Sequence, residues 1–169
     1  HVVGVGGAGM SAIAVVLTAM GHTVSGSDQR DSRVLERIAA AGVLTKVGHD
    51  ATEVTGVDAV AISTAIRDNH PAVVAARAAN IPVYRRADVL AGICAQRATI
   101  AVAGTHGKTT TSSMLALILV EADWQPSFII GGEVNELSGG AVWGSGDWFV
   151  VEADESDGTF LKLPADVAI

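Results

Sequence analysis

The sequence predicts an α/β protein, with one parallel-sheet domain followed by the start of a second α/β domain. Two observations support this prediction. Short apolar runs rich in Val, Ile and Ala alternate with stretches whose apolar residues recur at helical spacing. Two of those runs lead into glycine-rich turns that open helices, at residues 4–9 and 104–107. The composition agrees, because 49% hydrophobic and 17% charged residues suit strands that are buried on both faces.

The first domain is expected to span residues 1–95, and capping residues set the ends of its helices. Gly21 suits the position after the first helix, Asp31 or Ser32 caps the second, and Pro71 suits the first turn of the third. The expected strands are residues 2–5, 23–27, 43–47, 58–63 and 81–84. The first expected helix ends near residue 20, and the next three cover residues 32–41, 71–79 and 86–93.

The second domain is expected to begin near residue 96 and to continue to residue 169. Its first strand, residues 99–103, precedes a helix over residues 108–122, and further strands are expected at residues 127–130 and 148–152. The intervening residues 133–145 are glycine-rich and are predicted to be irregular. Residues 165–169 look like the start of another strand, so we expect this chain to be a fragment of a longer protein.

The first glycine-rich turn, residues 4–9, has the spacing of a dinucleotide-binding loop. Gly4, Gly6 and Gly9 form G-x-G-x-x-G after a strand, and Asp28 follows Gly9 by nineteen residues at the end of the second strand. Such glycines let a diphosphate approach a helix N-terminus, and the acidic side chain takes ribose hydroxyls. The pattern specifies a diphosphate and a sugar, which a nucleotide-sugar provides as well as NAD does. A tight turn with a purely structural purpose is the alternative.

The second turn, residues 104–109, is predicted to be a phosphate loop of the P-loop type. The backbone N–H groups of such a turn converge on an anion, Lys108 supplies a charge to the β- and γ-phosphates, and the Thr109 hydroxyl can coordinate Mg²⁺. The loop is short: two residues separate Gly104 from Gly107, and Val102 stands where a first glycine is usual. A helix cap that happens to precede Gly-Lys-Thr is the alternative. His106 lies within the loop and is a further functional candidate.

Four carboxylates crowd into residues 152–157, where an apolar strand ends. The C-terminal ends of parallel strands are where ligands bind in open α/β sheets. Like charges so close raise one another's pKa unless a cation is present, and Mg²⁺ accepts carboxylate oxygens. Glu152 is therefore the candidate metal ligand, while the sequence leaves open whether Asp154, Glu155 or Asp157 contributes. The alternative is a solvated acidic turn.

Charge and cysteine content exclude several function classes. The formal net charge is −7, and no basic run exceeds the pair Arg85-Arg86, so we expect neither nucleic acid nor a membrane surface as a partner. Cys94 is the single cysteine, which excludes a disulfide within the chain and favours the cytoplasm. No apolar run approaches the roughly 20 residues of a membrane span, and no signal peptide is visible.

Together these segments resemble the Mur ligase family of peptidoglycan synthesis. The match runs through the whole chain in order, and the short-spaced phosphate loop is the form that this family has. Four segments carry the resemblance: Gly4-Val5-Gly6-Gly7-Ala8-Gly9-Met10-Ser11, Ser25-Gly26-Ser27-Asp28, Ala103-Gly104-Thr105-His106-Gly107-Lys108-Thr109-Thr110-Thr111 and Glu152-Ala153-Asp154-Glu155-Ser156-Asp157.

The resemblance implies three domains, of which this chain carries a Rossmann-like first domain for a UDP substrate and the first part of a central ATP-binding domain. The resemblance also implies a C-terminal, amino-acid-binding domain, which we expect to be absent from this chain. The implied substrates are UDP-N-acetylmuramate, ATP and L-alanine, joined through an acyl phosphate with Mg²⁺ as cofactor. The implied UDP-substrate residues are Gly6, Gly7, Ala8, Gly9, Met10, Ser27, Asp28 and His49. The implied ATP residues are Gly104, Thr105, Gly107, Lys108, Thr109 and Thr110, with Lys108 and His106 catalytic and Thr109 and Glu152 on the metal.

Three other functions stay open at this point. A recycling ligase that joins a murein tripeptide to UDP-N-acetylmuramate shares the fold and the ATP chemistry, although Gly6-Gly7-Ala8-Gly9 favours the L-alanine-adding members. An NAD-dependent oxidoreductase or NAD-sensing regulator would explain the first glycine motif alone. A non-catalytic nucleotide-binding module is the third, and the chain by itself is expected to be inactive. The sequence leaves open whether the protein is a monomer or a homodimer.

Overall fold

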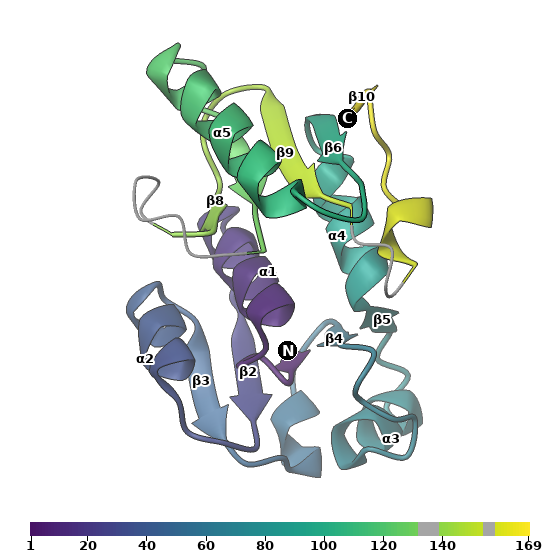
Figure 1. Ribbon diagram of the computed structural model, residues 1–169. Helices are drawn as coiled ribbons and strands as arrows, with labels where there is room; N and C mark the ends of the chain where they lie inside the picture. The colour runs from purple at the N-terminus through teal and green to yellow at the C-terminus, as the bar shows by residue number, and fades with distance from the viewer. Residues whose placement is uncertain (132–138, 154–157) are drawn as a thin grey trace. The chain divides into compact units, whose positions relative to one another are not determined.

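The structure is a computed structural model that describes residues 1–131, 139–153 and 158–169. The chain forms two compact units, His1–Val89 and Leu90–Ile169 (Figure 1). Each unit is built around its own five-stranded sheet. The α/β class predicted from the sequence is confirmed in both.

The first unit contains a wholly parallel sheet in the order β3-β2-β1-β4-β5. From β1 the chain builds outward to β2 and β3, then returns to place β4 on the other side of β1. This is the strand order of a Rossmann-like fold, in which ligands bind where the order reverses, here beyond the ends of β1 and β4. The strands are β1 Val2–Val3, β2 Ser25–Asp28, β3 Leu44–Val47, β4 Val60–Ile62 and β5 Val83–Arg85.

The helices of the first unit begin and end at the residues that the sequence marks. Ser32 caps α2 through its hydroxyl, which accepts a hydrogen bond from the N–H of Leu35, and Pro71 opens α3. Gly21 follows the first helix with φ +95°, a conformation that side chains disfavour. The helices are α1 Ala8–Ala19, α2 Arg33–Ala40, α3 Pro71–Ala78 and α4 Arg86–Cys94, the last of which runs into the second unit.

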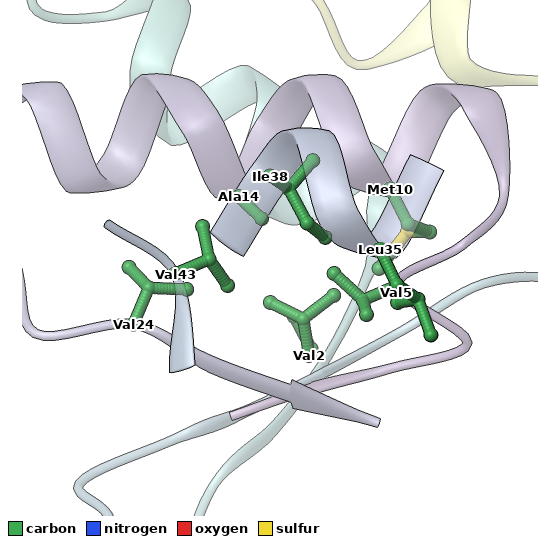
Figure 2. Packing of buried hydrophobic residues seen from close by; sticks show 9 residues of the cluster. Val2, Val5, Met10, Ala14, Val24, Leu35, Ile38 and Val43 are labelled. Carbon is green, nitrogen blue, oxygen red and sulfur yellow. The ribbon is translucent and has the colours of Figure 1, made fainter. Parts of the chain in front are cut away.

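One apolar cluster fixes α1 and α2 against the first sheet. Figure 2 shows side chains from both helices meeting valines of the strands and of the loops beside them. Met10 and Ala14 come from α1, and Leu35 and Ile38 from α2; they meet Val2, Val5, Val24 and Val43. Burial of this size is the main favourable term in folding, and it holds the start of α1 beside the end of β1.

The second unit has a mixed sheet in the order β10-β6-β9-β7-β8, in which the β7–β8 pair alone runs antiparallel among the described strands. Helix α5 covers Lys108–Glu121 and packs through Ala116 and Leu119 against Ile100, Phe128 and Val150 of the sheet. The strands are β6 Ala98–Val102, β7 Ser127–Ile129, β8 Ala141–Val142, β9 Trp148–Glu152 and β10 Val167–Ala168.

Some predicted boundaries were wrong. Strand β1 is two residues long because the chain turns at Gly4, and β5 lies one to two residues later than expected. The segment predicted to be irregular contains β8, which pairs with β7 although its two residues carry no alternating pattern. The short 3₁₀ turns Ala51–Val54 and Thr159–Leu161 were not predicted. None of the helices in the described part of the chain is both long and apolar enough to cross a membrane.

Candidate functional site

The glycine loop of the first unit, residues 4–9, is held in place by the backbone of β2. The carbonyl oxygen of Ser27 accepts hydrogen bonds from the N–H groups of Gly4 and Val5, at 2.8 and 3.0 Å. Gly4 has φ +75°, so the turn that follows β1 requires glycine there. The Ser27 side chain is buried, and this residue supports the loop from beneath through its backbone.

Asp28 closes the other side of the glycine loop. Its Oδ2 accepts a hydrogen bond from the N–H of Gly6 at 2.9 Å, and its Oδ1 accepts one from the N–H of Arg30 at 3.2 Å. A Cβ at Gly6 would lie 2.8 Å from Oδ2, so only glycine fits beside this carboxylate. The sequence motif predicted both residues in one site, and the structure brings them into direct contact.

The start of α1 offers an anion the positive end of a helix. Gly7 caps the helix without a side-chain hydrogen bond, and no acidic residue occupies the first turn. Gly7 and Ala8 are exposed, so the helix dipole and the first N–H groups are accessible to a ligand. Met10 differs from its neighbours: its side chain is 2% exposed within the core, and its N–H donates to the Gly7 carbonyl. Met10 therefore anchors the helix start.

Arg86 also lies at the glycine loop, although no sequence motif predicted it there. A Cβ at Gly9 would lie 2.7 Å from the Arg86 Nε and 3.2 Å from the guanidinium carbon. Gly9 thus leaves the space that this guanidinium fills, at the first residue of α4. A permanent positive charge beside the N-terminus of α1 suits a diphosphate. The Arg85-Arg86 pair was visible in the sequence, but its position could come only from the fold.

His49 is held by its neighbours within the first unit. Its Nδ1 lies 3.2 Å from the Ser27 Oγ, and its ring meets the His70 ring edge-on at 4.6 Å between centroids. Burial and the nearby His49 lower the pKa of His70, while Glu53 opposes that shift. His49 therefore contacts β2 at Ser27, the residue before Asp28. Three of the predicted UDP-substrate residues, Ser27, Asp28 and His49, thus lie close together.

His1 and Glu53 form a buried polar pair that contacts the same serine as His49. The His1 ring nitrogens lie 2.9 Å from the Ser25 Oγ and 3.2 Å from the Ser27 Oγ. The Glu53 carboxylate, 2% exposed, lies 3.4 Å from His1 Nε2 and 3.8 Å from Lys46 Nζ. These side chains fix the serines of β2, and through Ser27 they set the position of His49.

The phosphate loop of the second unit has two glycines in the left-handed region. Gly104 has φ +127° and Gly107, which caps α5, has φ +79°. The Lys108 Nζ donates a hydrogen bond to the Gly104 carbonyl at 2.7 Å, so the lysine side chain folds back over the loop. This is where it would meet an anion held by the loop. The other predicted residues of the loop, namely Thr105, His106, Thr109 and Thr110, are exposed.

Glu152 lies at the C-terminal end of β9, directly beside the strand that feeds the phosphate loop. The register of the parallel pair β6–β9 sets Val102 opposite Glu152. Its Oε1 is buried and has no hydrogen-bond partner among the described residues. Asp154, Glu155 and Asp157 lie outside the described residues. Within the described ranges no three His, Cys, Asp or Glu side chains form a metal-binding group, so a cation here would also need phosphate, hydroxyl or water oxygens.

Comparisons with known proteins relate this chain to one family. The sequence profile of the Mur ligase family, catalytic domain, matches residues 1–98. The UDP-N-acetylmuramate–L-alanine ligase of Rhodopseudomonas palustris strain HaA2 is 53% identical over all 169 residues, and its counterpart in Bradyrhizobium sp. strain ORS 278 is also 53% identical. The chain spans 36% of the length of each of these relatives.

Solved structures give the same result. The UDP-N-acetylmuramate–alanine ligase of Thermotoga maritima matches 99% of this chain with a TM-score of 0.92 and 32% identity, over 40% of its own length. The UDP-N-acetylmuramate:L-alanyl-γ-D-glutamyl-meso-diaminopimelate ligase of Neisseria meningitides matches 99% with a TM-score of 0.89 and 28% identity, over 58% of its length. The chain therefore belongs to the Mur ligase family.

Proposed function

We propose that this chain supplies the UDP-substrate site and the phosphate loop of an ATP-dependent ligase that joins L-alanine to UDP-N-acetylmuramate in peptidoglycan synthesis. One observation carries the ATP half of the proposal. The register of β6 and β9 puts a buried, unpartnered carboxylate oxygen of Glu152 beside the strand that feeds the phosphate loop. The substrates come from similarity, because relatives 53% identical over the whole chain carry that activity in their names.

The residues of the second unit fit Mg²⁺ with ATP. Carboxylate and hydroxyl oxygens are the ligands that Mg²⁺ prefers, and it usually keeps several waters. Glu152 and Thr109 would hold the ion together with phosphate oxygens. When bound, Mg²⁺ neutralises charge on the β- and γ-phosphate oxygens. Lys108 would leave the Gly104 carbonyl and donate to the same phosphates, and the loop N–H groups would complete the anion site.

The first unit fits the UDP part of the substrate. The diphosphate would lie at the start of α1, between the exposed backbone of Gly7 and Ala8 and the guanidinium of Arg86. Asp28 and His49 would lie toward the ribose and base, since Asp28 ends β2 and His49 follows the neighbouring strand β3 and contacts Ser27. Residues 1–95 would form this domain, with residues 96–169 beginning the ATP-binding one.

The reaction would use these groups for positioning and charge stabilisation. A lactoyl carboxylate oxygen attacks the γ-phosphorus of ATP, ADP leaves, and an acyl phosphate forms. The amine of L-alanine then attacks the acyl carbon, loses a proton, and expels phosphate to leave an amide. Lys108 and the loop N–H groups stabilise the charge on the transferring phosphoryl group, and His106 lies close enough in sequence to contribute. ATP and UDP-sugars are cytoplasmic metabolites, which fits a cytoplasmic location.

A murein-tripeptide recycling ligase is the second candidate, because the Neisseria enzyme has nearly the same fold over this chain. The first candidate is favoured by the higher identity to the L-alanine ligases. An NAD-dependent enzyme is disfavoured, because that function leaves the phosphate loop and Glu152 without a purpose.

Phosphate release by the full-length protein tests the proposal. The protein is supplied with MgATP and UDP-N-acetylmuramate, together with L-alanine, glycine, L-serine or the tripeptide in separate reactions. We expect phosphate release to require all three substrates and to be fastest with L-alanine. Fastest release with the tripeptide would support the recycling ligase. No release with any amine would contradict the ligase proposal altogether.

A further inference from the structure

Gly131, just after β7, lies against the carboxylate of Glu152. A Cβ at Gly131 would lie 2.7 Å from the Glu152 Oε2, closer than a real Cβ approaches another atom, and 3.5 Å from its Cδ. The last residue pair between β7 and β9 is Ile129 opposite Val151. Gly131 and Glu152 follow shortly after Ile129 and Val151 in the chain. Any residue other than glycine at position 131 would displace the carboxylate.

Backbone conformation does not explain this glycine. Gly104 and Gly107 need glycine because their φ angles are positive, whereas Gly131 is not among the residues with positive φ. Glycine is therefore needed at position 131 because a side chain there would take up space. That space is filled by the end of one charged side chain.

The other carboxylate oxygen shows why the position matters. Glu152 Oε1 is buried and has no hydrogen-bond partner within the described part of the chain. A buried carboxylate oxygen without a partner is costly, and it is retained where something else binds to it. With Oε2 against Gly131, the Glu152 side chain keeps Oε1 for such a ligand.

We propose that Gly131 is a positioning residue for the cation site: it gives the Glu152 carboxylate the room to adopt the orientation in which Oε1 is left for Mg²⁺. This inference rests on the proposed Mg²⁺–ATP function of the second unit. Neighbouring groups that orient a metal ligand typically change metal affinity about 10- to 100-fold when they are altered. A methyl group at position 131 has that effect without removing the ligand itself.

The test uses four variants of the full-length protein: Gly131→Ala, Glu152→Asp, the double variant, and Gly92→Ala as the matched control. Apart from its chain neighbours and its own helix backbone, Gly92 has no atom within 4 Å of an added Cβ, and its φ is not positive. The affinity for ATP is measured by calorimetry with Mg²⁺ and again with EDTA. We expect Gly131→Ala to weaken MgATP binding about tenfold or more and to leave metal-free ATP binding unchanged. Gly92→Ala should match the wild type in both measurements.

The double variant separates positioning from a general structural effect. Aspartate is one methylene shorter than glutamate, so its carboxylate lies farther from the added methyl. Gly131→Ala should therefore weaken MgATP binding little further once Glu152→Asp is present. The melting temperature of the double variant should likewise equal that of Glu152→Asp. Equal losses with and without Mg²⁺, or additive losses in the double variant, would overturn the inference. Wild-type protein that binds MgATP no better than ATP in EDTA would overturn the proposed function, and this inference with it.

Discussion

The carboxylate of Asp28 accepts a hydrogen bond from the N–H of Gly6 at 2.9 Å, and the absence of a side chain at Gly6 makes that contact possible. The second unit repeats the relationship, since Gly131 leaves room for Glu152. In each sheet a glycine after one strand receives a carboxylate from the end of a neighbouring strand. The carboxylates of the two proposed nucleotide sites thus both lie where a glycine leaves room for them.

Gly6→Ala should weaken binding of the UDP substrate. The new methyl would lie 2.8 Å from the Asp28 Oδ2, so the hydrogen bond breaks and the loop shifts. Losing a hydrogen bond to a charged group costs about 1.5–3 kcal/mol, which is about tenfold or more in affinity. Calorimetric titration of the full-length protein with UDP-N-acetylmuramate measures this, with Gly92→Ala as the control. Unchanged affinity would mean that the Asp28 contact has no part in binding.

Gly26→Ala should destabilise the first unit. Gly26 lies in β2, and a Cβ there would come within 2.8 Å of three atoms of the Val5 side chain in the core. Overpacking of a dense core costs about 1–3 kcal/mol. Urea unfolding gives the free energy of unfolding, and Gly92→Ala, in the interior of α4, should be neutral or stabilising. Equal stability of Gly26→Ala and the wild type would contradict this packing.

The sequence was sufficient for the elements that carry local signals. The caps at Ser32 and Pro71 and the two glycine-rich turns are where the sequence predicted them, because capping and turn chemistry depend on adjacent residues. Strand β8 was missed because two residues pairing with a distant strand have no periodicity to detect. Pairing of that kind is decided by tertiary contacts.

The candidate site could be predicted only in part, for a similar reason. Motif spacing predicted site residues that the structure places at the ends of β1, β2, β6 and β9. It could not find Arg86, which meets Gly9 from 77 positions away, or Gly131, whose importance depends on the orientation of one side chain. It also treated Met10 like its neighbours, although helical geometry turns that side chain into the core.

Cys94 should be unreactive in the folded protein. Burial raises the pKa of its thiol to about 12, and the side chain is fully buried in α4. The thiolate is the nucleophile, so almost none is present near neutral pH. Iodoacetamide labelling, followed by mass spectrometry of the peptide that contains Cys94, should show modification only after denaturant is added. Native labelling as fast as that of free glutathione would contradict the buried position.

The stability of the first unit should fall on acidification through His70. Its pKa is lowered by burial and by His49, so the unfolded chain binds the proton more tightly than the folded one does. The free energy of unfolding therefore holds above the ordinary histidine pKa of about 6.5 and decreases as the pH falls below it. Protonation would also remove the Nδ1 acceptor that caps α3 through the N–H of Ala72.

His70→Asn isolates this effect, since asparagine caps a helix without titrating. Urea unfolding at several pH values between about 8 and 5 gives the free energy of unfolding. That free energy should decrease more steeply with falling pH in the wild type than in the variant. Parallel curves for the two proteins would exclude His70 as the cause.

The central claim is that one chain holds two separate nucleotide sites, a UDP-sugar site at residues 4–9 and an ATP site at residues 104–109. Calorimetry of the full-length protein with each ligand tests it most directly in two variants. Lys108→Ala removes a charged donor from the phosphate loop, while Gly9→Val fills the space that Arg86 occupies. We predict that Lys108→Ala loses MgATP binding and keeps UDP-N-acetylmuramate binding, and that Gly9→Val does the reverse. Loss of both ligands in both variants, or tight NADH binding by a wild-type protein that ignores UDP-N-acetylmuramate, would contradict the account.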